Sequence, residues 1–325
     1  MRRAKASTGT ALPDRLGLSK HSFWHTLWQQ RQLAFMSVPM LLYILLFSYA
    51  PLWGWLTAFM DYKPAKPMFD NAWVGLANFR WLFSRAEFML AIRNTFMMSI
   101  ITLVFNTVSA ITLAVLLNEI TARKFKRTVQ TVTYLPHFLS WVIVVGLAQN
   151  MFATDGIVNA VLLRLGLIQS PLFFLGEGRY FWWLVGLIHI WKEAGWNSII
   201  YLSAMSSIDP ALYEAAEMDG AGRFKRIWHI TLPGIKSTFV VLLVMNIGML
   251  IGGQGDGNFD IPYLMGQNLL MDWSQTIDIF VLKYGISKGQ YGRATAAGIF
   301  KSVVAIVLLF SANRIAKRLD EPTLL

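Results

Sequence analysis

The hydrophobic residues of this chain are gathered into long runs instead of alternating with polar residues. Six runs are long enough to cross a bilayer as α-helices, which takes about 20 mainly apolar residues each. They cover residues 33–60, 94–118, 128–154, 180–206, 237–255 and 294–313. The pattern predicts an all-α, polytopic membrane protein with six transmembrane helices in residues 33–313. The first run is too long for the core of a signal peptide, so we expect it to remain as an anchor.

Basic residues indicate which ends of these helices face the cytoplasm. With the N-terminus inside, the four inner segments carry 17 Lys and Arg in 83 residues, whereas the three outer segments carry 10 in 96. Cytoplasmic loops are enriched in Lys and Arg. The asymmetry therefore predicts two cytoplasmic tails, a basic one at residues 1–32 and a second at 314–325. The inner loops are then 119–127 and 207–236.

The outer segments are longer than hairpins between helices require. They cover residues 61–93, 155–179 and 256–293, and they contain short amphipathic stretches at 159–167 and 276–284. Amphipathic helices of this kind lie in the interface of a membrane. We expect them to cap an outer cavity.

Composition narrows the possible functions. The chain has 325 residues, of which 55% are hydrophobic and only 14% charged, whereas soluble domains carry about 25% charged residues. Cysteine is absent, which excludes thiolate metal sites and cysteine nucleophiles. The five histidines lack a third ligand at suitable spacing, so no metal site is expected. The net charge of +11 indicates contact with anionic lipid and not with nucleic acid.

No stretch fits the phosphate-binding pattern Gly-x-x-x-x-Gly-Lys-Ser/Thr. If ATP drives this protein, a partner subunit must bind it together with Mg²⁺, and the chain itself needs no cofactor. We therefore do not expect it to be an enzyme.

The inner loop 207–236 contains a short helix with clear boundaries. Asp209 is a suitable N-cap, Pro210 fits the first helical position, and Gly220 can adopt the left-handed conformation that ends a helix. Small Ala215 and Ala216 allow another surface to approach closely. The neighbouring acidic side chains, Glu214 and Glu217, depart from the basic character of inner loops, which favours a protein partner over lipid.

The spacing of this loop resembles the EAA motif of ABC-importer permeases. The matching residues are Glu214, Ala215, Ala216, Asp219, Gly220, Ile230, Leu232 and Pro233. In that family the loop forms a coupling helix that sits in a groove of the ATPase subunit. The resemblance implies the type I ABC-importer permease fold.

Further stretches resemble the carbohydrate-uptake branch related to the maltose permeases, and within it the polysaccharide and lipo-oligosaccharide group. They include residues 61–64, 73–79, 117–119, 125–131, 134–141, 191–192 and 298–302. The similarity extends to permease subunits of bacterial alginate importers. Residues 261–273 depart from the group's pattern.

The resemblance implies a set of partners and a mechanism. It implies a second permease subunit in a homo- or heterodimer, two ABC ATPase subunits and an extracytoplasmic solute-binding protein. Together they would import an oligosaccharide across the bacterial inner membrane by alternating access. Two alternatives are a polytopic glycosyl- or acyl-transferase and a secondary transporter that works without ATP.

A pair of charges interrupts the fourth hydrophobic run at Lys192 and Glu193. Ionised side chains are costly at the centre of a membrane, about 2.5 to 3.5 kcal/mol on insertion scales. Adjacent helical residues point about 100° apart, so we expect the two not to pair with each other. They either line the substrate pathway or pair with another span. Lys301, near the start of the sixth run, is expected to extend towards the outer interface. The expected pathway residues are Lys192, Glu193, Trp196, Asn197 and Asn246.

Overall fold

The computed structural model describes residues 28, 30–249, 258–266 and 268–318, and its regular elements in these residues are helices. The chain divides into two units, Met1–Gly54 and Trp55–Leu325. The α-helices are α2 (Arg31–Ile44), α3 (Ala77–Phe83), α4 (Ala86–Glu119), α5 (Arg123–Tyr134), α6 (Trp141–Phe152), α7 (Ile157–Arg164), α8 (Gly178–Ser206), α9 (Pro210–Met218), α10 (Arg223–Arg226), α11 (Leu232–Gly234), α12 (Lys236–Met249), α13 (Asp260–Met265), α14 (Met271–Ser274), α15 (Ile277–Leu282) and α16 (Tyr291–Arg318).

The first unit contains most of the first predicted span, whose last residues belong to the second unit. Helix α2 continues into a π-helical turn, Leu45–Tyr49, and a 3₁₀ segment, Ala50–Phe59. Together they form one helical stretch, Arg31–Phe59, that is long and apolar enough to cross a membrane. The change of helical type falls around Pro51, whose missing N–H interrupts the regular α-helical hydrogen bonds.

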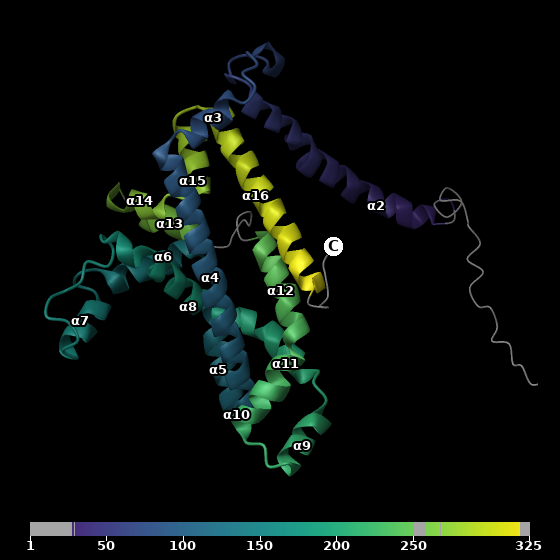
Figure 1. Cartoon of the computed structure of the whole chain (residues 1–325), viewed down its shortest axis with the longest axis vertical. Helices are drawn as coiled ribbons and strands as arrows, with labels where there is room; N and C mark the ends of the chain where they lie inside the picture. The colour runs from purple at the N-terminus through teal and green to yellow at the C-terminus, as the bar shows by residue number, and fades with distance from the viewer. Residues whose placement is uncertain (1–27, 29, 250–257, 267, 319–325) are drawn as a thin grey trace, which may run out of the picture. The chain divides into compact units, whose positions relative to one another are not determined.

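The second unit is built around α4 and α8, which pack along each other. Met98 of α4 shares a core with Phe181 and Ile188 of α8, and further along, Ala110 shares another with Tyr201. Because these partners follow in the same order, the two helices run in the same direction, as the predicted topology requires of the second and fourth spans. Figure 1 shows α9 at one end of this unit and α3 at the other.

A second helix pair, α12 and α16, runs antiparallel. Val240 and Val244 pack with Ala312 and Ala316. A Cβ atom at Gly248 would lie 2.9 Å from the Leu309 side chain, so the missing side chain allows the two helices to approach closely. In the sequence Gly248 and Gly252 form a Gly-x-x-x-Gly pattern, which favours close helix packing, but Gly252 lies outside the described residues.

The count of six spans is only partly matched in the described part of the chain. Four stretches are long and apolar enough to span a membrane: Arg31–Phe59, Ala86–Glu119, Trp141–Arg164 and Tyr291–Arg318. A fifth is the pair Arg223–Gly234 and Lys236–Met249, bent by 56°. Helix α8 has the length of a span, but the polar side chains at its centre reduce its hydropathy.

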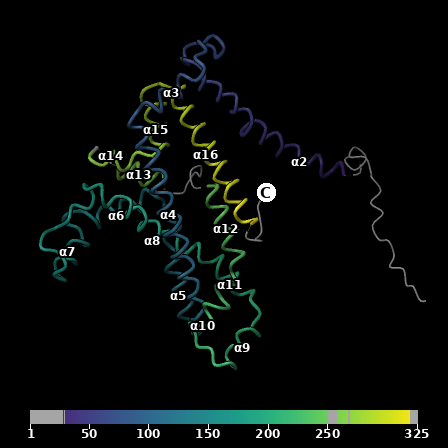
Figure 2. The backbone as a smooth tube through the Cα atoms, in the orientation of Figure 1, coloured from purple at the N-terminus to yellow at the C-terminus, as the bar shows by residue number. Residues whose placement is uncertain are grey.

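The third predicted span, residues 128–154, is not one helix. Helix α5 begins earlier, at Arg123, and ends at Tyr134; a 3₁₀ turn, Leu135–Phe138, follows, and the chain restarts as α6 at Trp141. Leu139 is extended, and the Ser140 side chain accepts a hydrogen bond from the Ile143 N–H as an N-cap. Figure 2 shows the chain turning aside between α5 and α6. A hydropathy pattern does not detect this break because the residues around it remain apolar.

The two amphipathic stretches expected in the outer segments are helical. Residues 159–167 fall largely in α7, and residues 276–284 form α15 and the π-helical turn Lys283–Ser287. Thr276 caps α15 by accepting a hydrogen bond from the Ile279 N–H.

Candidate functional site

Helix α9 has the boundaries expected from the sequence. The Asp209 carboxylate accepts a hydrogen bond of 2.9 Å from the Ala211 N–H, and Pro210 occupies the first turn. At the other end Gly220 has a φ of +72°, and the Ala221 N–H donates to the Ala216 carbonyl at 2.8 Å. A residue with a Cβ is strained at this φ, so the glycine is required for the end of α9.

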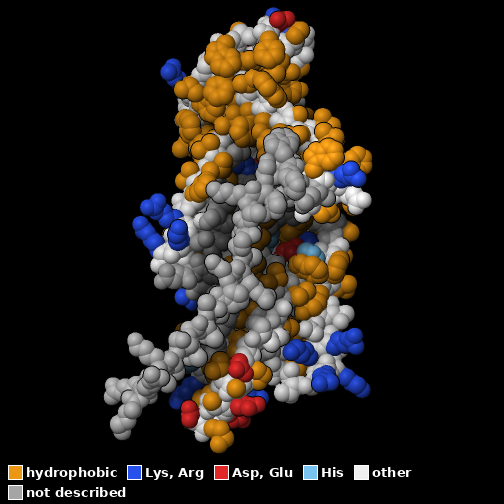
Figure 3. Space-filling view, turned by 90° about the vertical axis from the view of Figure 1, so that its right-hand side faces the viewer, with side chains coloured by type: hydrophobic (Ala, Val, Ile, Leu, Met, Phe, Trp, Pro, Cys, Tyr) orange, Lys and Arg blue, Asp and Glu red, His pale blue; other side chains and the backbone are white. Residues whose placement is uncertain are grey.

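A few contacts attach α9 to the following segment while leaving most of its surface free. The Tyr213 hydroxyl lies 3.0 Å from the Thr231 hydroxyl, and Arg226 donates to the Glu217 carboxylate at 3.0 Å. None of the α9 residues is buried. Leu212 and Met218 are exposed apolar side chains beside exposed acidic ones. Figure 3 shows this combination as orange and red side chains at the lower end of the molecule.

The remaining residues of the EAA pattern lie in the segment that follows α9 and packs beneath it. Ile230 and Leu232 are partly buried, and Leu232 packs against the core that includes Tyr201 and Met205. A Cβ atom at Gly234 would lie 2.5 Å from the Ile208 side chain. The pattern therefore combines an exposed helix, Pro210–Met218, with residues that hold its flanks on α8 and α12.

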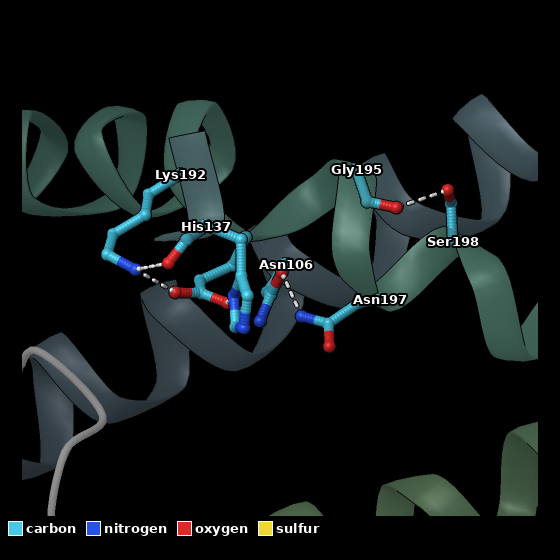
Figure 4. A network of polar contacts seen from close by, with 7 residues as sticks. Asn106, His137, Lys192, Gly195, Asn197 and Ser198 are labelled. Carbon is cyan, nitrogen blue, oxygen red and sulfur yellow. Dashed lines mark hydrogen bonds and ion pairs between the residues drawn. The ribbon is translucent and has the colours of Figure 1, made fainter. Parts of the chain in front are cut away.

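A second polar group lies at the break in the third span. The Lys192 ammonium of α8 donates to the His137 carbonyl at 2.7 Å and to the Glu193 carboxylate at 2.9 Å. The other Glu193 oxygen lies 2.7 Å from the His137 Nδ1. Figure 4 shows Lys192 of α8 reaching His137, which lies in the 3₁₀ turn after α5. Carbonyls at a helix break need partners away from water, and Lys192 provides one.

The expectation that Lys192 and Glu193 do not pair is wrong. Although their Cα–Cβ bonds diverge, the long lysine chain folds back over the Trp141 ring, at 4.8 Å, and reaches the Glu193 carboxylate. Both side chains are largely buried, and the carboxylate offsets the ammonium charge. This pair, the Lys192–Glu193 brace, holds α8 against the broken span, so the Lys192 ammonium is paired within the described part of the chain.

The remaining predicted pathway residues lie apart from this brace or at its edge. Trp196 is exposed and stacks on the His137 ring, with centroids 4.4 Å apart and planes within 2°. Asn197 donates to the Asn106 side chain of α4 at 3.0 Å, and its own carbonyl oxygen points away from that bond in Figure 4. Asn246 is exposed on α12. The sequence reading missed Asn106, which belongs to no motif, and missed the role of His137, although Pro136 marked a break there.

A third polar cluster lies at the start of α4. Glu87 of α4 accepts hydrogen bonds from Lys283 at 2.5 Å, Tyr284 at 2.7 Å and Gln275 at 2.8 Å. Burial raises the pKa of Tyr284 to about 12, and the hydrogen bond to Glu87 adds to the shift. Tyr284 therefore remains a neutral donor at physiological pH.

Two other expectations for the outer region can be compared with the structure. Lys301 extends towards the predicted outer segment 256–293, where its ammonium lies 2.5 Å from the Asp278 carboxylate of α15. Residues 261–273, which depart from the sequence pattern of the polysaccharide group, end in a stretch that is bonded to α4. The Asn94 amide donates to the carbonyls of Asp272 and of the nearby Gln275, at 3.1 Å each. Arg93 lies over the rings of Trp182 and Trp273.

Comparison with known proteins identifies the class of molecule. A family model described as "Binding-protein-dependent transport system inner membrane component" matches residues 106–321. The permease protein YteP of a polygalacturonan/rhamnogalacturonan transport system of Bacillus subtilis (strain 168) is 42% identical, over 90% of each chain. Protein LplB of the same organism is 40% identical, over 92% of this chain and 93% of its own.

Solved structures agree with this result. A chain of a bacterial ABC transporter involved in the import of the acidic polysaccharide alginate is 36% identical, with a TM-score of 0.81 over 91% of this chain and 98% of that one. A chain of an alginate ABC transporter in complex with its alginate pentasaccharide-bound periplasmic protein is 35% identical. Its TM-score is 0.84, over 93% and 99% of the two chains.

These matches confirm the predicted permease fold, and they give no support to a membrane enzyme or to a secondary transporter. The family match covers both the brace at Lys192 and the EAA loop. The chain therefore belongs to the family of inner membrane components of binding-protein-dependent transport systems, the permease subunits of ABC importers.

Proposed function

We propose that this chain is one of two permease subunits through which an ABC importer takes up oligosaccharides, with acidic sugars as its substrates. The observation that carries the coupling part of this proposal is the exposed helix α9. It is capped at both ends and attached to the spans by only a few contacts, and its surface mixes apolar and acidic side chains. Such a surface fits a partner protein.

The partners follow from the family and the missing ATP-binding motif. Two ATPase subunits would bind ATP and Mg²⁺, and α9 would insert into one of them through Glu214, Ala215, Ala216 and the turn at Gly220. A second permease subunit, identical or different, would complete the pathway. An extracytoplasmic solute-binding protein would deliver the sugar, as the family's dependence on binding proteins requires.

The substrate class rests on the relatives. The names of YteP and of the alginate transporter both refer to polysaccharides that contain uronic acids, and both proteins match at least 90% of this chain. Uronic-acid oligomers carry one carboxylate per acidic residue. Such charges are costly to move through a low-dielectric region unless polar or cationic groups offset them.

The side chains proposed to meet the sugar lie beside the brace. Trp196 offers an exposed aromatic face, fixed by its stacking on His137. The Asn106 and Asn197 amides retain groups for sugar hydroxyls, and Asn246 would contribute from α12. The Lys192–Glu193 brace would hold α8 and the broken span in place around them.

The proposed mechanism is alternating access in the inner membrane with both termini in the cytoplasm. Residues 1–32 and 314–325 would be cytoplasmic tails. Closure of the ATPase dimer would move α9, and the segment from Ile230 to Pro233 would transmit that movement to α8 and α12, against which it packs.

Two glycines of the same loop provide a matched test of the coupling role. Gly220 has a φ of +72°, whereas Gly222 has a φ of −68° and open space around its Cβ position. Gly220→Val should distort the end of α9 and abolish ATP-dependent uptake, while Gly222→Val should retain most of it. Both variants are compared at equal amounts of assembled transporter. Wild-type uptake and wild-type ATP hydrolysis in Gly220→Val would show that α9 does not couple the subunits.

A further inference from the structure

Five cations lie on the two short helices that border the end of α4. Four lie in the first turns of α5 and one in α10; we call them the basic collar, formed by Arg123, Lys124, Lys126, Arg127 and Lys225. Four of them are exposed and Lys126 is partly exposed. Among the described residues, no acidic side chain forms a salt bridge with any of the five.

Two acidic side chains near the collar in the chain pair with other cations. Glu119, at the end of α4, pairs with Arg223 at 3.7 Å, which also places the start of α10 beside the α4–α5 junction. Glu217 of α9 pairs with Arg226 at 3.0 Å. The positive charge of the collar is therefore not offset within the described part of the chain.

Large aromatic side chains alternate with these cations. Phe125 is 61% exposed within α5, Phe224 is 89% exposed within α10, and Trp228 in the following turn is 69% exposed. Exposed aromatics next to Lys and Arg are typical of the membrane–water interface, where the rings enter the headgroup region and the cations meet its phosphates.

The position of the collar in the chain agrees with that environment. The long apolar helix α4 ends at Glu119, and α5 begins at Arg123 and leads into the third predicted span. The collar thus lies at the end of α4, a helix long and apolar enough to cross a membrane. Helix α9 is acidic instead, and Figure 3 shows Lys and Arg side chains on one side of the lower end and Asp and Glu on another.

We propose that the basic collar is a binding site for the headgroups of anionic phospholipids, such as phosphatidylglycerol. Phosphate groups satisfy the charge of the collar, and Phe125, Phe224 and Trp228 lie among the glycerol and upper acyl segments. The site does not depend on the identity of the sugar or on the role of α9. With the proposed orientation, it lies in the cytoplasmic leaflet of the membrane. Each Lys or Arg near an anionic surface is expected to strengthen lipid binding about fivefold.

A single fluorescent reporter can test this site because the native chain contains no cysteine. Thr121 is exposed between α4 and α5, so a fluorophore on Thr121→Cys would be quenched by brominated lipid at the collar. The full chain, assembled with its partner subunits, is reconstituted into phosphatidylcholine bilayers with increasing phosphatidylglycerol. Either lipid is brominated in turn, and the chain without the cysteine corrects for background labelling.

The charge-removing variant is Lys124→Gln with Arg127→Gln. Its matched control, Lys63→Gln with Lys66→Gln, removes two exposed cations from the outer segment. Wild-type protein should bind phosphatidylglycerol in preference to phosphatidylcholine. The collar variant should lose at least about tenfold of that preference, and the control should keep it. Raising the salt from about 0.1 M to about 1 M should weaken the wild-type preference without any substitution.

Four results would overturn the proposal. The first is equal binding of the two lipids to the wild type, and the second is an equal loss in the collar variant and its control. The third is the absence of quenching by either lipid, which would show that a partner protein covers the collar. If the collar variant does not assemble, an unchanged preference of the wild type at high salt overturns it as well.

Discussion

Replacing Glu193 by glutamine would remove the carboxylate that bonds the Lys192 ammonium. In the native chain the Lys192 side chain is 5% exposed and the Glu193 side chain 14%. Removing one partner of a buried ion pair costs about 3 to 5 kcal/mol, because the other charge remains in a low-dielectric site. The amide oxygen of the introduced side chain retains one hydrogen bond, worth about 1 kcal/mol. We therefore expect Glu193→Gln to reduce the free energy of unfolding by about 2 to 4 kcal/mol.

The control for this prediction is a surface pair of the same type. Glu177 lies 2.6 Å from Arg179, but their side chains are 40% and 66% exposed. Exposed pairs contribute about 0 to 1 kcal/mol, so Glu177→Gln should change little. Reversible unfolding in mixed micelles, followed by helical circular dichroism, gives the free energy for each variant.

A double substitution separates charge from packing. Lys192→Met with Glu193→Gln leaves no buried charge, so it should be more stable than Glu193→Gln alone. If Glu193→Gln is as stable as Glu177→Gln, the two charges are not buried against each other. The single variant Lys192→Met completes the comparison. If the loss of unfolding free energy in the double variant equals the sum of the losses in Lys192→Met and Glu193→Gln, the two side chains are not coupled, and the brace does not exist as described.

Three further predictions concern packing, the outer segment and topology. Gly195→Ala would place a Cβ 1.9 Å from the Thr133 carbonyl oxygen. Because this contact would push α5 away from α8, the substitution should lower the free energy of unfolding by about 1 to 3 kcal/mol. Unchanged thermal unfolding would contradict that packing. Asn94→Ala removes the side-chain donor to the Gln275 carbonyl and leaves the Asp272 carbonyl with the Arg93 donor alone, so amide hydrogen exchange in α14 should become faster, and unaltered exchange would show that the segment is held elsewhere. An impermeant thiol reagent added to cells should label Phe69→Cys, which is exposed in an outer segment, but not Lys317→Cys; labelling of the latter would reverse the proposed orientation.

The elements that could be predicted from the sequence are those set by local chemistry. Long apolar runs predicted α4 and α16, because a helix satisfies its own backbone within the membrane. Asp209, Pro210 and Gly220 predicted both ends of α9, because a cap and a left-handed glycine act within a few residues.

The features that could not be predicted depend on contacts between distant segments or on a break within an apolar run. The Lys192 ammonium reaches Glu193 because Trp141 and the His137 carbonyl from another segment direct its chain. The break at Leu139 escaped a hydropathy count, although Pro136 and Ser140 are suitable residues for a turn and a cap. The attachment of the outer segment to Asn94 joins residues 181 positions apart, which no local pattern encodes.

Uptake by the reconstituted transporter tests the central claim most directly. The assembled importer in proteoliposomes is given ATP and oligosaccharides of equal length, one series built of uronic acids and one of neutral sugars, each with its binding protein. The proposed function predicts ATP-dependent accumulation of the uronic-acid oligomers, a weaker signal for neutral ones, and loss of uptake in Gly220→Val but not in Gly222→Val. Accumulation without ATP, or no uptake of any oligosaccharide, would contradict it.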